Sequence, residues 1–265
     1  MRSSASLSLL FFLLVFGWGR SAFADAPRPA FSITYTDAAP AVTAALGDAA
    51  WGHAATIDSL GLMLGPQAKG LVPLSTKVLA KWDDEYLYIR FVCTGGDLYN
   101  PSSGHDAPLF HGDVVEVFLD PVGDSREFVE LDVSPDNSVL DEIHFLTAEP
   151  QSDEHGGLLF DVIKRDTWDF PSWDMAGLKT ATSRLGPTDK PTGWIADFAI
   201  PAAELLRRNG LKQFEPMTLR ANFARYDMVP NGTQPRTFIA MSWTPVEWGR
   251  PHRSPQAMGE LRLVK

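Results

Sequence analysis

The chain has 265 residues, of which 45% are hydrophobic and eight are tryptophan, so it can bury a large core and is not typical of a disordered protein. Its formal net charge of −10 argues against a nucleic-acid-binding protein, which needs a basic surface. The single cysteine, Cys93, excludes an intrachain disulfide and argues against a cysteine-based zinc site. Its apolar neighbours predict that Cys93 is a buried core residue.

The first residues, Met1–Ala24, have the pattern of a secretory signal peptide. Arg2 supplies the positive start, Leu7–Phe16 is an apolar run too short to span a bilayer, and Ala22-Phe23-Ala24 resembles a cleavage site. We expect cleavage near Ala24 and export to the periplasm or the medium, with no later membrane span.

The rest of the chain shows no long Ser, Gly or Pro linker and no internal repeat. Residues 25–45 are rich in Ala and Pro and are interpreted as an N-terminal lead-in. Residues 46–265 are predicted to form one domain.

Most of this domain consists of short runs with alternating or continuous apolar residues, separated by turn signals, as is typical of strands. In Glu127–Val133 the alternation predicts one core face and one solvent face. One short helix is expected at Pro201–Arg208, followed by the stop signal Asn209-Gly210. The pattern predicts an all-β fold, an antiparallel β-sandwich of the jelly-roll or immunoglobulin-like kind. The predicted strands are Phe31–Tyr35, Thr76–Trp82, Tyr86–Val92, Val114–Asp120, Glu127–Val133, Val139–Phe145, Leu158–Lys164, Leu178–Ser183, Trp194–Ile200, Thr218–Tyr226, Thr237–Trp243 and Glu260–Val264.

Polar residues interrupt several of these strands. Glu116 lies between Val114 and Phe118, and a buried carboxylate is costly unless it is paired or holds a ligand. Glu130 and Asp132 form a polar row on the next predicted strand. Such rows suit the hydroxyl groups of a sugar, but they also occur on an ordinary solvated sheet face, and both interpretations stay open. The candidate partners for Glu116 are Arg90, Arg225 and Arg236.

The tryptophans fall into two groups. Trp51, Trp82 and Trp194 lie in apolar-periodic segments, which predicts core positions. The second group lies in predicted loops that contain Gly, Pro and Asp, and it comprises Trp168, Trp173 and Trp248. An aromatic ring in such a loop either packs against the protein or binds a ligand.

Four motifs in a fixed order resemble the family 9 carbohydrate-binding modules and their wider β-sandwich superfamily. They are Gly47–Trp51, Lys77–Phe91 (KVLAKWDDEYLYIRF), Phe110–Asp120 (FHGDVVEVFLD), and the ending from Ser242-Trp243-Thr244-Pro245 to His252–Leu261. They span about residues 45–265.

The resemblance implies a sugar-binding site. In that family two tryptophans sandwich a terminal sugar ring, and the matching positions hold Phe110 and His252. Glu116 matches the family's ligand-contacting carboxylate, whereas the family's basic contact on the following strand is acidic, at Glu130 or Asp132. Trp248 is a candidate substitute platform.

Other residues complete the expected binding site. Asp113 is expected to support the start of its strand, Arg90 to balance Glu116, and Trp173 to lie at the rim. Some family members bind structural calcium, for which the acidic loops Asp120–Asp124 and Asp132–Asp141 are candidates, although neither has calcium-loop spacing.

The leading hypothesis is a secreted, non-catalytic carbohydrate-binding protein. It would bind a polysaccharide or an oligosaccharide and would not bind nucleic acid. Separate glycoside hydrolases would act on the same polysaccharide. A weak glycoside hydrolase using Glu116 with Glu130 or Asp132 is one alternative, since that reaction needs two carboxyl groups.

A haem b-binding redox domain is the other alternative, because the same superfamily includes such domains. Non-covalent haem would need axial ligands, for which the candidates are Met175, Met217, Met228, Met241, Met258, His105, His111, His144, His155 and His252. The loop His105–His111 either binds a metal or is a surface turn.

Overall fold

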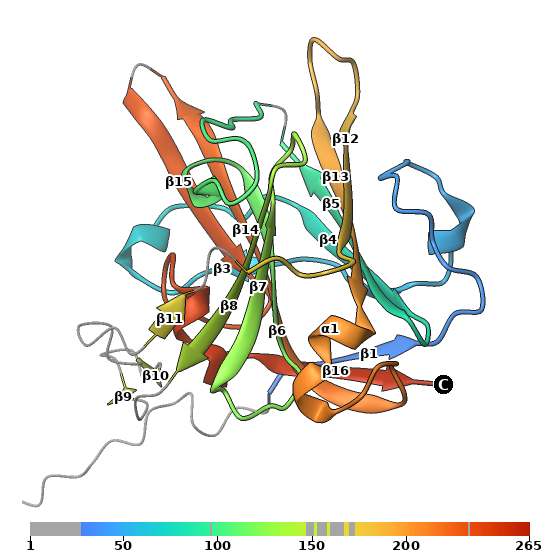
Figure 1. The fold of residues 1–265 in the computed structure, drawn as a ribbon. Helices are drawn as coiled ribbons and strands as arrows, with labels where there is room; N and C mark the ends of the chain where they lie inside the picture. Colours follow the sequence, from blue (N-terminus) through green and yellow to red (C-terminus); the bar gives the residue numbers. More distant parts are fainter. Residues whose placement is uncertain are drawn as a thin grey trace, which may run out of the picture.

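The computed structural model describes residues 28–95, 97–146, 151–152, 158–159, 167–169, 173–232 and 234–265. Their main strands form two sheets that pack against each other, which confirms the predicted β-sandwich (Figure 1). The predicted signal peptide Met1–Ala24, and most of the predicted strand Leu158–Lys164, lie outside the described residues. None of the helices in the described part of the chain is long and apolar enough to cross a membrane.

The larger sheet has nine strands, in the order β1-β16-β14-β6-β7-β8-β11, with β15 paired to β14 and β3 paired to β15. Its pairs are antiparallel except for β1 with β16, which is parallel. The strands are β1 (Ala30–Thr34), β3 (Gly61–Leu62), β6 (Val114–Asp120), β7 (Glu127–Val133), β8 (Val139–Leu146), β11 (Thr167–Asp169), β14 (Met217–Asn231), β15 (Gln234–Ser242) and β16 (Gly259–Val264).

The smaller sheet has five antiparallel strands, in the order β12-β13-β5-β4-β2. They are β2 (Ala55–Ile57), β4 (Thr76–Trp82), β5 (Tyr86–Thr94), β12 (Lys179–Leu185) and β13 (Gly193–Pro201). A separate short pair joins β9 (Gln151–Ser152) to β10 (Leu158–Leu159).

Helical structure is short everywhere in the described chain. The predicted helix is one turn, α1 (Ala202–Leu205), because its continuation Arg207–Asn209 winds as a 3₁₀ turn and Gly210 then takes a left-handed conformation. The other 3₁₀ turns are Ala49–Trp51, Pro66–Ala68, Leu109–His111, Pro251–Arg253 and Pro255–Ala257.

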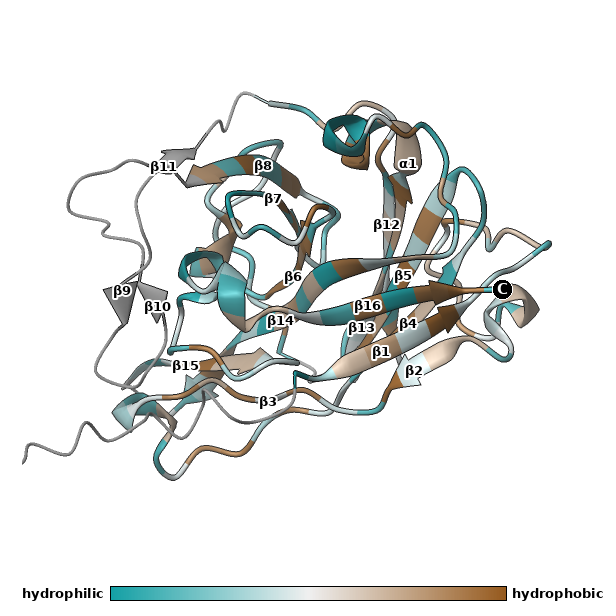
Figure 2. Cartoon of the chain, turned by 90° about the horizontal axis from the view of Figure 1, so that it is seen from below, coloured by the Kyte–Doolittle hydropathy of each residue, from teal (hydrophilic) through white to brown (hydrophobic). Residues whose placement is uncertain are grey.

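The hairpin of β4 and β5 shows how local sequence sets the strand boundaries. The Asp83 carboxylate accepts hydrogen bonds from the backbone N–H groups of Glu85 (2.9 Å) and Tyr86 (2.8 Å), so it closes the turn where the sequence predicts one. In a strand with alternating apolar and polar residues, the apolar side chains point toward the core. Figure 2 shows this alternation as brown and teal bands along β16, in the other sheet.

The main core lies between the two sheets. It contains Trp82, Trp194 and Cys93, all fully buried, as the sequence predicts. Trp51 is also buried, as predicted, but in a small cluster with Tyr88 and Ala199 on the outer side of the five-stranded sheet.

A second apolar cluster covers the other face of the nine-stranded sheet. It combines side chains of β6, β7, β8, β14 and β15 with side chains from the connecting segments. The prediction of a solvent face on Glu127–Val133 is therefore wrong, because both faces of β6 and nearly all of β7 are buried. The covering residues from outside these strands are Met63, Leu109, Val246 and Met258, with Trp248 packed at the edge.

Candidate functional site

The most unusual feature of the second cluster is a group of three buried carboxylates. Glu116 on β6 is the direct cross-strand neighbour of Asp132 on β7, and Glu130 is opposite Phe118, one pair further along the same face. Glu116 and Asp132 are 1% and 0% exposed, and Glu130 is 7% exposed. One oxygen from each of the three lies within 4.8 Å of the others.

These carboxylates have few partners among the described residues. Glu116 Oε2 and both carboxylate oxygens of Asp132 accept no hydrogen bond. Burial, followed by the charge of Glu130, raises the pKa of Glu116 well above its ordinary value. Burial and then the carboxylates of Glu116, Glu130 and Glu142 do the same to the pKa of Asp132. A negative charge at this position is therefore costly without a bound cation or proton.

Two further strands contribute to the same group. Glu142 on β8 is opposite Glu130, and His144 is opposite Phe128, whose ring stacks on the imidazole with centroids 4.7 Å apart. His144 Nε2 lies 2.7 Å from Glu130 Oε2 and 3.7 Å from Glu142 Oε2. Burial and the three carboxylates raise the pKa of Tyr226, on β14. Sequence analysis missed Glu142, His144 and Tyr226 as members of this group, although the alternation along Val139–Phe145 puts the first two on one face.

The expected balance of Glu116 by Arg90 is wrong. Arg90 is on β5 in the other sheet, where its Nε lies 2.6 Å from Asp197 Oδ1 and one terminal nitrogen lies 2.8 Å from Asp197 Oδ2. Arg90 also donates to the carbonyl oxygen of Ala45 and lies over the Trp51 ring. The register of β5 and β13 pairs it directly with Asp197, a residue that sequence analysis did not single out.

The other two arginines considered for Glu116 are also engaged elsewhere. Arg225 is fully buried on the main-core side of β14, where it pairs with Asp227 and donates to Thr76 Oγ1 and to the Thr94 carbonyl. Arg236 pairs with Asp97 at 2.5 Å.

Asp113 has the supporting role expected at the start of its strand. Its two carboxylate oxygens accept hydrogen bonds from the backbone N–H groups of Tyr99 and Met228, each at 2.8 Å, and so hold three segments together. Burial and then the nearby Asp227 raise the pKa of Asp113 to about 7.

The predicted aromatic residues are distributed unequally. Phe110 is 47% exposed and lies edge-on to His111, next to Leu109 of the second cluster. Trp248 is half-buried against the second cluster and meets the Phe238 ring at 5.8 Å. His252 stacks on His144 with ring centroids 6.4 Å apart. Trp173 instead packs against the main core, on the other face of the sheet from Glu116.

The two loops considered for calcium do not form two calcium loops. In Asp120–Asp124, Asp120 accepts three backbone N–H groups and Asp124 pairs with Arg208 at 2.9 Å. In Asp132–Asp141, the two end residues belong to different groups: Asp132 to the acidic cluster, and Asp141 to a group around His105.

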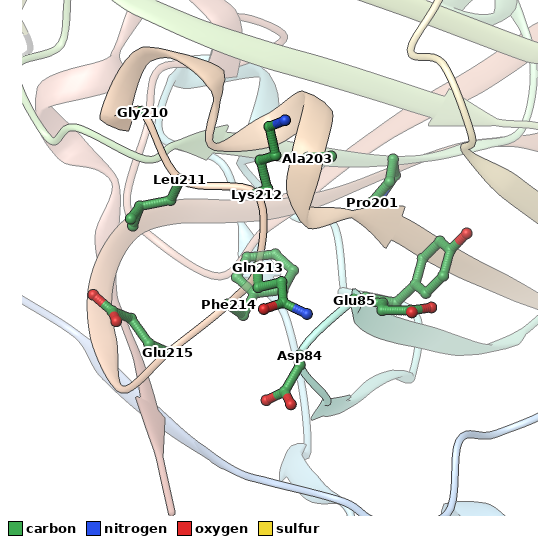
Figure 3. A pocket seen from close by; sticks show the side chains of 11 residues that line it. Asp84, Glu85, Pro201, Ala203, Gly210, Leu211, Lys212, Gln213, Phe214 and Glu215 are labelled. Atoms are coloured by element: carbon green, nitrogen blue, oxygen red, sulfur yellow. The ribbon is translucent and has the colours of Figure 1, made fainter.

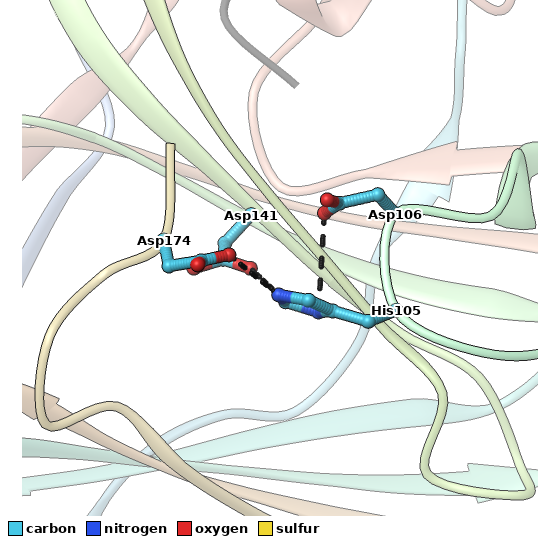
Figure 4. Close-up of side chains that lie close together, drawn as sticks. All are labelled: His105, Asp106, Asp141 and Asp174. Atoms are coloured by element: carbon cyan, nitrogen blue, oxygen red, sulfur yellow. Dashed lines mark hydrogen bonds and ion pairs between the residues drawn. The ribbon is translucent and has the colours of Figure 1, made fainter. Parts of the chain in front are cut away.

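Figure 4 shows the group around His105, in which His105, Asp106 and Asp174 are exposed and Asp141 is buried. His105 Nε2 lies 2.6 Å from Asp174 Oδ1 and 3.7 Å from Asp141 Oδ1, and its Nδ1 lies 3.8 Å from Asp106 Oδ1. The hydrogen bond that the His105 ring donates to the Asp174 carboxylate is the main reason that the pKa of His105 is raised. His111 is not a member of this group, so the two predicted histidines do not bind one metal together.

Figure 3 shows a hollow of about 870 Å³ whose lining includes none of the predicted site residues. It is formed between the β4–β5 turn and the segment after α1, and its lining mixes charged and apolar groups such as Asp84, Glu85, Lys212 and Phe214. Of the predicted site residues, Glu116, Asp132, Trp248 and His252 lie in or beside the second cluster, and Phe110 follows its Leu109 in the chain. Arg90, Asp113 and Trp173 do not, because Asp113 lies near Asp227 and Arg225 on the main-core side of the nine-stranded sheet.

The alternative functions gain little from this arrangement. The three carboxylates are buried, so they offer no exposed pair to a glycoside substrate. Of the candidate haem ligands, Met175, Met241 and Met258 are buried in the two cores.

Comparisons with known proteins agree with the fold. Residues 43–265 match the family model described as carbohydrate family 9 binding domain-like. No curated protein gives a significant match. The similar solved structures include the following three, and at these identities they show the fold alone.

The first is a provisionally assigned carbohydrate-binding protein from Bacteroides uniformis, with 14% identity and a TM-score of 0.59, covering 89% of this chain and 100% of that one. The second is a family 9 carbohydrate-binding module from Caldicellulosiruptor kristjanssonii in complex with cellotriose (15% identity, TM-score 0.58, 89% and 93% covered). The third is a family 9 module from the same organism in complex with glucose (16% identity, TM-score 0.54, 89% and 96% covered).

Proposed function

Because the chain belongs to the carbohydrate family 9 binding domain-like family, we propose that it binds saccharides at the edge of the second cluster, on that side of the nine-stranded sheet. The family modules from Caldicellulosiruptor kristjanssonii, in complex with cellotriose and with glucose, make short β-glucan fragments the first ligands to test. The binding is non-catalytic and serves polysaccharide use.

The observation that carries this proposal is the set of rings around the second cluster. Phe110 offers an exposed ring at the position where the family has a stacking tryptophan, and Trp248 lies at the edge of the same cluster. An aromatic ring packs on the apolar C–H face of a sugar, while polar groups bind its hydroxyls. His252 adds a side chain that stacks and also forms hydrogen bonds.

Titration calorimetry with glucose, cellobiose and cellotriose tests the proposal. Replacing Phe110 or Trp248 by Ala should weaken binding about fivefold, since each ring contributes about 1 kcal/mol of stacking. The matched control is Tyr86→Ala, which removes a ring from the outer side of the other sheet, where Lys179 lies over it. Equal affinity in wild type and both site variants, or no heat at millimolar sugar, would refute the proposed site.

Export and a partner enzyme complete the proposal. The Met1–Ala24 pattern supports cleavage and secretion into the periplasm or medium, where polysaccharide fragments and separate glycoside hydrolases would be available. Amino-terminal sequencing of the protein recovered from an expressing bacterium should begin at Asp25. Recovery of the uncleaved chain from the cytoplasm would contradict export.

A further inference from the structure

The buried acidic cluster of Glu116, Glu130 and Asp132 has a chemical requirement that saccharide binding leaves unmet. Within the described residues, no lysine or arginine forms an ion pair with any of the three. Three like charges in an apolar surrounding are expensive, and hydroxyl groups of a sugar carry no compensating charge.

The geometry of the cluster fits a small cation. One oxygen from each residue lies within 4.8 Å of the others, and two oxygens on opposite sides of an ion bound at about 2.4 Å are separated by about that distance. Glu116 Oε2 and both oxygens of Asp132 remain without a hydrogen bond, although the two residues are 1% and 0% exposed. Both residues therefore keep carboxylate lone pairs that no hydrogen-bond donor of the described residues occupies.

We propose that Glu116, Glu130 and Asp132 bind one divalent cation of the hard, oxygen-preferring class, namely Ca²⁺, Mg²⁺ or Mn²⁺. The ion compensates two of the three negative charges and joins β6 to β7 beneath the covering segments. His144 is a positioning residue in this site, because its Nε2 lies 2.7 Å from Glu130 Oε2 and orients that carboxylate.

The His105 group is the natural internal control. There His105 itself contacts all three carboxylates, at 2.6 Å, 3.7 Å and 3.8 Å, and Asp174 and Asp106 are accessible to water. Its charges are therefore compensated or solvated without an ion, in contrast to those of the buried cluster.

The test uses the full chain, stripped with EDTA and dialysed, without any sugar. Ca²⁺, Mg²⁺ and Mn²⁺ are each added at millimolar concentration, the thermal midpoint is recorded, and bound metal is counted after dialysis by elemental analysis. At least one ion should bind at about one per chain and raise the midpoint by about 5 °C, because it binds the folded state.

Variants then locate the ion. Glu116→Gln and Asp132→Asn keep the side-chain size and should abolish the midpoint shift and the bound metal, whereas Asp174→Asn should retain both. Near-ultraviolet circular dichroism verifies that each variant is folded. The proposal fails if no ion binds wild type, if the two cluster variants respond like wild type, or if only Asp174→Asn loses the response. Because no saccharide is present, this result does not depend on the proposed function.

Discussion

Two groups of buried charged residues, one on each sheet, differ in how their charges are compensated. On the five-stranded sheet, Arg90 and Asp197 form a two-pronged ion pair, and Trp51 covers the guanidinium. On the nine-stranded sheet, Glu116, Glu130 and Asp132 are also buried, but the charged groups nearest to them are one another's carboxylates. The exception is His144, which lies beside Glu130. The first group is complete in the folded chain and has a structural role. The second has no lysine or arginine partner among the described residues, and His144 contacts only Glu130 of the three, which is the property expected of a binding site.

Breaking the ion pair between Arg90 and Asp197 should have the largest effect on stability. Asp197→Ala leaves Arg90 buried without its counter-charge and also removes the acceptor for the Ala44 backbone N–H. The free energy of unfolding, measured in urea, should fall by about 3–5 kcal/mol. A loss below about 1 kcal/mol would show that Arg90 finds another partner or reaches water.

A pH dependence should come from Asp113, whose carboxyl group has a pKa raised from 3.8 to about 7. A group with a raised pKa in the folded state contributes stability below its unfolded pKa, and loses that contribution as the pH rises through the folded value. Wild type should therefore lose about 2 kcal/mol between pH 5 and pH 8 relative to Asp113→Asn, which does not titrate. Parallel stability curves for the two proteins would contradict the assignment to Asp113.

Neutralising one carboxylate of the group formed by Glu116, Glu130 and Asp132 should raise the free energy of unfolding, whereas breaking the Arg90–Asp197 pair lowers it. In EDTA, Glu116→Gln removes one of three buried like charges and supplies an amide N–H that can donate to Asp132. The free energy of unfolding should rise by about 1 kcal/mol. Asp58→Asn, at a side chain that is 81% exposed, serves as the control and should change it by less than about 0.5 kcal/mol. Destabilisation by Glu116→Gln in EDTA would mean that the carboxylate is already compensated.

The smallest effect is expected at a solvent-exposed ion pair. Arg208 pairs with Asp124 at 2.9 Å and with Glu127 at 3.2 Å, with side chains between 15% and 33% exposed. Arg208→Ala should cost less than about 1 kcal/mol, and the loss should shrink further in 0.5 M salt. A salt-insensitive loss would place the contribution in packing of the arginine stem.

Local sequence rules accounted for the framework well. Turn residues and alternation located β4, β6 and β7 at their observed bounds, and the apolar neighbours of Cys93 and Trp194 marked them as core. Period-two alternation also put Glu130 and Asp132 on one face of their strand, and Glu116 on the face of its own strand that carries Val114 and Phe118. These are properties of a strand and its immediate neighbours, so a single sequence is sufficient to derive them.

The sequence by itself thus determined the all-β class, the positions of the longer strands and the polar row on β7, but not the short strands β2 and β3. Only the tertiary structure decided that Arg90 pairs with Asp197 rather than Glu116, because that choice depends on which strands are neighbours in which sheet. It also decided that the acidic row is buried, because the cover comes from Met63, Leu109, Val246 and Met258, which are far apart in the chain. Burial and pairing are set by contacts distant in sequence, and these convert an acidic strand face into a candidate ion site.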